Sequence, residues 1–119
     1  MDEKMRAFLS LMQSAFFLAK HAHDCSFDNN EENRQEDKCA AMAYASACIA
    51  KYSAAEAIYW TTPDLEHGEI PELFAQFDTF THELLTDFET DHSRQWVNSE
   101  FDRLQELYEA SVCNRQIED

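Results

Sequence analysis

The sequence predicts an all-α protein, an antiparallel four-helix bundle formed by a single helical domain over residues 1–119. Turn-forming residues are scarce, because the 119 residues include one glycine and two prolines, and this leaves little material for β-hairpins. Four segments of roughly twenty residues repeat their apolar residues at helical spacing. One long and two short connections separate these segments, and such connections favour antiparallel neighbours.

The first helix is expected from about Asp2 to Asp24. Leu11, Phe17 and Leu18 lie outside its inward face, which indicates either burial on two sides or an exposed patch for a partner or a second copy of the chain. We expect neither an export signal nor a membrane span in residues 7–19, because this apolar run is short and follows two acidic residues. The predicted inward face comprises Met5, Phe8, Met12, Phe16, Ala19 and His23.

The second helix, expected from about Glu36 to Trp60 after a polar loop over residues 26–37, is the element on which the bundle is predicted to assemble. Lys51 and Glu56 are the only charges between Cys39 and Trp60, so the helix is predicted to be apolar on nearly every face and therefore buried. An alanine stripe should let a neighbouring helix approach to the short end of the usual range of about 8 to 10 Å. The stripe comprises Ala43, Ala47, Ala50, Ala54 and Ala57, and Met42, Ile49 and Trp60 lie on one flank of it.

Two further helices are expected in the second half of the chain. A helix-start signature at residues 61–66 is ended by Gly68, so only a short turn is expected there. The third helix should then run from about Pro71 to Asp91, and the fourth should end at about Cys113. Their predicted core faces are Leu73, Phe77, Phe80, Leu84 and Phe88 in the third helix, and Val97, Phe101, Leu104, Tyr108 and Val112 in the fourth.

The net charge of −15 is the most unusual global property of the chain. Residues 1–60 hold nine acidic and six basic residues, a net charge of −3, whereas residues 61–119 hold fifteen acidic residues and three arginines, a net charge of −12. Such a field repels nucleic acids and anionic membranes and attracts basic surfaces. The alternative is that the acidic residues serve solubility alone.

The four cysteines show neither a C-x-x-C pair nor zinc-finger spacing. Reduced thiols in the cytoplasm are therefore expected. A disulfide between Cys25 and Cys39, which would close the polar loop, remains an alternative.

No metal, cofactor or catalytic residue is predicted. The E-x-x-H pair of Glu89 and His92 has no second copy, and di-iron bundles use two such motifs. On a continuous helix His21 and His23 lie about 200° apart and cannot share an ion, although His21 and Cys25 share a face. The chain lacks G-x-S-x-G and any glycine-rich phosphate loop, which argues against nucleophilic catalysis.

Candidate partner-binding residues lie on the acidic face of the second half. Asp102, Glu106 and Glu109 step by about 6 Å and then about 4.5 Å along the fourth helix. Glu72 and Glu83 of the third helix are expected to extend this surface. Phosphates on a nucleic-acid strand have a similar spacing, with about 3.4 Å of axial rise per nucleotide. An ordinary solvated helix face is the alternative interpretation.

These observations favour a non-enzymatic acidic protein that binds and inhibits a basic, nucleic-acid-handling partner protein. Nucleic-acid mimics, anti-CRISPR and antirestriction proteins, and immunity proteins against nuclease toxins share this charge and size, which is an analogy and not a sequence resemblance. Direct binding to nucleic acid or to a membrane is not expected. Two alternatives stay open. One is a metal-binding enzyme or sensor that uses His21, His23, Cys25 and Glu89 or His92. The other is a structural subunit that forms a homodimer through Leu11, Phe17 and Leu18.

Overall fold

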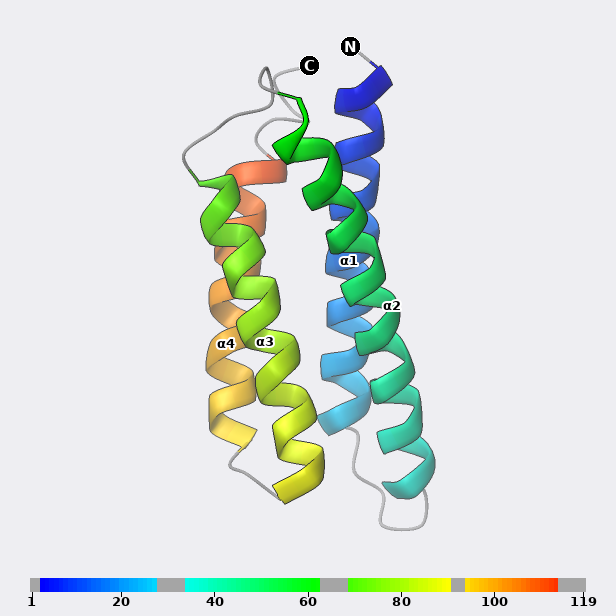
Figure 1. The fold of residues 1–119 in the computed structure, drawn as a ribbon. Coiled ribbons are helices and arrows are strands. Elements are labelled where there is room, and N and C mark those ends of the chain that lie inside the picture. Colours follow the sequence, from blue (N-terminus) through cyan, green and yellow to red (C-terminus); the bar gives the residue numbers. More distant parts are fainter. Residues whose placement is uncertain (1–2, 28–33, 63–68, 91–93, 114–119) are drawn as a thin grey trace.

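The computed structural model describes residues 3–27, 34–62, 69–90 and 94–113, and within these ranges the chain is helical without a strand. Figure 1 shows that consecutive helices run in opposite directions, with α1 and α2 on one side of the molecule and α3 and α4 on the other. The predicted all-α class is confirmed. The elements are α1 (Glu3–Phe27), α2 (Arg34–Trp60), α3 (Ile70–Thr90), α4 (Arg94–Tyr108) and a π-helical turn, η3 (Glu109–Cys113).

The helix boundaries differ from the expected ones mainly around the predicted polar loop. Helix α1 continues to Phe27, and α2 already begins at Arg34, so the predicted loop over residues 26–37 was too long. The additional turn of α2 contains Gln35 and Glu36, which have good helix propensity although they show no apolar period. Acidic residues in a first helical turn are also stabilised by the helix dipole. The short turn predicted before Gly68 lies outside the described residues.

One hydrophobic core extends through all four helices. Phe8, Phe77 and Phe80 are its largest fully buried side chains, and burying a residue of this size contributes about 1.5 to 3 kcal/mol. The ring of Phe16 in α1 stacks on that of Tyr108 in α4, with centroids 4.2 Å apart. The core faces predicted for α3 and α4 are confirmed for every described side chain, and in α1 only Met5 and His23 are less than fully buried. The buried members are Phe8, Met12, Phe16, Ala19, Leu73, Phe77, Phe80, Leu84, Val97, Phe101, Leu104, Tyr108 and Val112.

The prediction that α2 is buried on nearly every face was wrong, and so was the choice of its packing face. Four residues of the expected alanine stripe, Ala43, Ala50, Ala54 and Ala57, are exposed, and Ala47 is half-buried. The buried row lies on nearly the opposite side of the helix, at about 100° per residue. Its members are Ala41, Ala45, Cys48, Tyr52, Ala55 and Tyr59. The large rings of Tyr52 and Tyr59 decide the orientation, because burying an aromatic side chain removes far more apolar area from water than burying a methyl group.

Helix α2 makes two very different contacts with its neighbours. Its contact with α1 is by far the most extensive between any two described elements, whereas its contact with α3 is sparse. Both helices carry small buried residues, which are the type that allows two backbones to approach closely. These residues are Ala15, Ala19 and Ala22 of α1 and Ala41, Ala45 and Ala55 of α2, all fully buried.

Candidate functional site

Four of the five predicted partner-binding carboxylates lie on the surface. Glu72, Asp102, Glu106 and Glu109 are exposed, and Glu83 is half-buried. Within the described part of the chain, none of the five forms an ion pair with a lysine or arginine. The amide of Gln105 donates a hydrogen bond of 3.1 Å to Glu109. Their negative charge is therefore left without internal compensation by cations.

The structure does not join the five carboxylates into one row. The amide of Gln76 in α3 donates hydrogen bonds to the backbone oxygen and to the carboxylate of Glu100 in α4, at 2.8 and 2.6 Å, and this contact marks where the two helices meet. Glu72 and Glu83 lie on the same side of α3 as Gln76, within about 40° of it. Asp102, by contrast, lies about 200° around α4 from Glu100, and Glu106, one turn further along α4, lies on that same far side. The predicted extension from α4 onto α3 is not formed.

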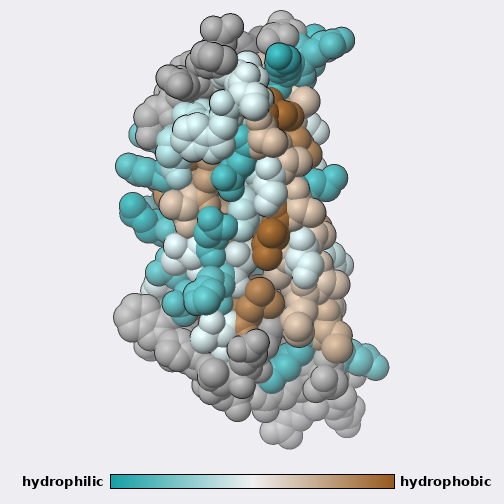
Figure 2. All heavy atoms as spheres, in the orientation of Figure 1, coloured by the Kyte–Doolittle hydropathy of each residue, from teal (hydrophilic) through white to brown (hydrophobic). Residues whose placement is uncertain are grey.

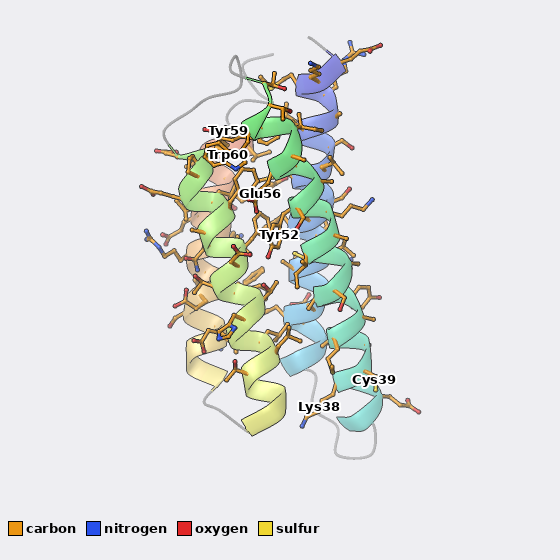
Figure 3. All side chains as sticks on the ribbon, in the orientation of Figure 1. Lys38, Cys39, Tyr52, Glu56, Tyr59 and Trp60 are labelled. Atoms are coloured by element: carbon orange, nitrogen blue, oxygen red, sulfur yellow. The ribbon has the colours of Figure 1, made fainter. Side chains whose placement is uncertain are left out.

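A groove between α2 and α3 gathers functional groups that the sequence did not bring together. It is open to solvent and has a volume of about 520 Å³. Figure 3 shows that Tyr52, Glu56 and Trp60 project from α2 toward α3 along this side of the bundle. Its lining residues are Ile49, Tyr52, Asp78, Thr79, Thr81, His82, Glu83 and Leu85.

Tyr52 forms the link across the groove. Its ring stacks on that of Phe77 with centroids 5.2 Å apart, and its hydroxyl donates a hydrogen bond to the carboxylate of Asp78. Burial and this hydrogen bond raise the pKa of the Tyr52 hydroxyl far above its usual value of 10.0. The tyrosine is therefore a neutral donor in this hydrogen bond, and the Asp78 side chain is its acceptor.

The groove is anionic. Burial raises the pKa of Glu56, and the charge of Asp78 raises it further, while a hydrogen bond from Trp60 lowers it. No lysine or arginine is among the described residues that line the groove. One carboxylate oxygen of Glu83 is buried without a hydrogen-bond partner, but this side chain lies on the side of α3 that meets α4 and not on the side of Asp78. The groove thus presents the carboxylates of Asp78 and Glu56 without a lysine or arginine beside them among the described lining residues.

Apolar side chains line part of the groove. Ile49 and Leu85 line it and are half-buried, and Met42 and Trp60, 46% and 62% exposed, share the flank of α2 that carries Ile49. In Figure 2 separate strongly hydrophobic patches are seen between the two sides of the bundle, and hydrophilic residues are frequent on the side of α3 and α4. The apolar flank of α2 could be recognised in the sequence, since Met42, Ile49 and Trp60 share it. This pattern did not predict a groove, because the sequence did not show which helix lies beside that flank.

The histidines of the alternative metal site point to different neighbours. The ring of His21 lies 5.3 Å from that of Tyr44 in α2. His23 faces α4, where its Nε2 lies 2.7 Å from Oδ1 of Asn98 and its ring stacks on Phe101 at 4.4 Å. No group of three or more histidine, cysteine, aspartate or glutamate side chains in the described ranges is arranged to hold a metal ion. Glu89 and His92 lie outside the side chains that the structure describes.

The cysteines and the predicted dimer patch can also be placed. The structure shows no disulfide between Cys25 and Cys39, so the alternative pairing of these two cysteines is not formed. Leu11 and Leu18 are partly buried against the core. Phe17, at 48% exposed, is the one member of that patch with a largely exposed side chain.

The comparisons of this chain with protein-family models, curated proteins and solved structures find no match. None of the described helices combines the length and apolar character needed to cross a membrane. The function is therefore inferred from the charges, the groove and their geometry.

Proposed function

We propose that this protein is a non-enzymatic cytoplasmic inhibitor that binds a basic, nucleic-acid-handling partner protein through its acidic side. The observation that carries the proposal is the uncompensated charge of α3 and α4. Residues 61–119 have a net charge of −12, and the described carboxylates of these helices form no ion pair with lysine or arginine. A protein that used acidic residues mainly for its own stability would pair more of them internally.

The proposed mechanism is occlusion of a basic surface. Carboxylates held on rigid helices lose little conformational freedom on binding, so they suit a groove that normally holds nucleic-acid phosphates. Complementary charge accelerates association and makes it dependent on salt concentration. Phage and plasmid inhibitors, antirestriction and anti-CRISPR proteins, and toxin-immunity proteins are the classes with this mode of action.

A pull-down with the untagged protein as bait tests the proposal, with bound proteins identified by mass spectrometry at low and at high salt. We expect a basic nuclease, polymerase or similar protein to be retained at low salt and released as salt rises. Retention of nothing basic, or only of further copies of this chain, would contradict it.

Two charge-matched variants then locate the binding surface. One replaces Glu72, Asp102 and Glu106 by their amides, and the control does the same to Glu3, Asp24 and Glu36, which are also exposed. Both variants lose three negative charges. We expect only the first to release the partner at a lower salt concentration. An equal effect of both would indicate a general field and not a binding face.

A further inference from the structure

We propose that the groove between α2 and α3 is the docking site for an amphipathic, basic helix of the partner protein. The inference rests on the proposed function and names the segment of the partner that would be recognised. The docked helix places an apolar row against Ile49 and Leu85, and its arginines or lysines against Asp78 and Glu56.

Between α2 and α3 the bundle leaves several apolar side chains only partly covered. Ile49 and Leu85 are only half-buried, and Trp60 at one end and Met42 at the other are largely exposed. Ile49 and Leu85 line the groove, and Met42 and Trp60 share the flank of α2 that carries Ile49, within about 20° of it. Exposed apolar side chains along one flank of a helix, beside polar residues, are the surface that an amphipathic helix covers (Figure 2).

The negative charges in the groove indicate that its occupant is positively charged. Asp78 and Glu56 are close enough for the charge of the first to raise the pKa of the second, and no described lysine or arginine lines the groove. A guanidinium group supplies several N–H donors together with positive charge, so arginine on the partner would pair with these two carboxylates.

The length of the apolar flank of α2, and the secondary structure beside it, favour a helix as the occupant of the groove. Met42 and Trp60 are eighteen residues apart on a straight α2, which corresponds to about 27 Å, or five turns of a partner helix. The described residues offer no strand edge to which an extended peptide could add. A second copy of this chain is disfavoured as the occupant, because each copy carries a net charge of −15.

The test uses a synthetic peptide probe with the intact protein. The probe is a fluorescein-labelled helical peptide of about 18 residues, with leucines on one face, arginines on both flanks and alanines elsewhere. Its control is an isomer of identical composition in which the leucines are distributed around the helix. In fluorescence anisotropy at about 0.15 M salt we expect the amphipathic peptide to bind at least about tenfold more tightly than its isomer, since only the first presents one apolar row.

Matched variants separate the groove from the general field. Ile49→Gln with Leu85→Gln should weaken binding about tenfold or more, while Phe17→Gln, which removes an exposed ring from α1, should leave it unchanged. Asp78→Asn should weaken binding more than Asp102→Asn, although both remove one charge. Far-UV circular dichroism and urea unfolding confirm that each variant is folded.

The outcomes distinguish the two proposals. Equal affinity for the two peptides, or equal weakening by the groove and control variants, would overturn the groove and leave an acidic inhibitor in place. If neither peptide binds but a basic protein is still captured, the groove proposal is overturned and the proposal of an acidic inhibitor stands. Failure of both peptides together with the absence of any captured basic protein would overturn both proposals.

Discussion

The two sides of α2 show how one helix can make both a closed and an open contact. Toward α1 the contact is extensive, and both helices carry alanines without solvent exposure. Toward α3 the contact is sparse, and Tyr52 reaches across to Asp78 beside a groove of about 520 Å³. The difference lies in side-chain size and charge: small residues bring backbones together, whereas a large ring and neighbouring carboxylates hold them apart.

Thiol reactivity should show the largest contrast between the closed and the exposed parts of α2. Burial raises the pKa of Cys48 to about 12, whereas Cys39 is exposed. In variants that retain one of the four cysteines, Cys48 should react with a disulfide reagent at least about 100-fold more slowly than Cys39 near pH 8, because the thiolate is the reactive form. Rates within tenfold of each other would show that the closed side opens readily.

Enlarging an alanine should have a different effect on each face of α2. Ala45→Leu forces extra volume into a filled contact and should lower the free energy of unfolding by about 2 kcal/mol. Ala54→Leu is the matched control on the exposed face, where we expect a change within about 0.5 kcal/mol. Urea denaturation measures both. Similar destabilisation by the two substitutions would contradict the observed orientation of the helix.

Removing the Tyr52 hydroxyl tests the hydrogen bond that joins α2 to α3. Tyr52→Phe keeps the ring on Phe77 but loses the hydrogen bond to Asp78, so unfolding should require about 1 kcal/mol less. Tyr44→Phe, at a ring that is 37% exposed, is the control and should have little effect. Equal stability of Tyr52→Phe and the wild type would show that this hydrogen bond does not hold α2 to α3.

The smallest effect is expected from neutralising Glu56. Its pKa is raised above the usual 4.5, so the folded state binds the proton more tightly and stability falls as pH rises through the interval between these two values. Glu56→Gln should therefore increase the free energy of unfolding at pH 7 by up to roughly 0.5 kcal/mol, a small effect because Glu56 is only partly buried and solvent screens its charge. At about pH 3.5, where both forms are neutral, this gain should vanish.

A matched substitution checks that the gain belongs to the groove. Glu36→Gln removes the same charge from an exposed position on α2 that is far from Asp78 in the sequence. Urea unfolding at both pH values should show a smaller gain for this control. A larger gain for Glu36→Gln would mean that general charge repulsion, and not the proximity of Asp78, disfavours the carboxylate.

The sequence predicted α3 and α4 well because each carries one face of large apolar residues, so only one orientation removes them from water. It failed for α2, where alanines occur on every side and a methyl group gains little from burial. Tyr52 and Tyr59 were decisive there. The groove was not predictable, since it depends on the sparse contact between α2 and α3, a property of the whole bundle. The five carboxylates were correctly placed outside the predicted core faces, but their separation into two rows depends on how α3 meets α4.

The placement of the two helix pairs also gives the molecule an electric dipole moment. Helices α1 and α2 hold five acidic and six basic residues, a net charge of +1, whereas α3, α4 and η3 hold nine acidic and two basic residues, a net charge of −7. Because the two helix pairs form opposite sides of the bundle, the centre of negative charge of these elements is displaced toward α3 and α4 (Figure 1). In the field of a positively charged surface this asymmetry exerts a torque, which rotates the acidic side toward that surface within about a Debye length, before any contact forms. The exposed alanine face of α2 would then trail, turned away from the surface being approached.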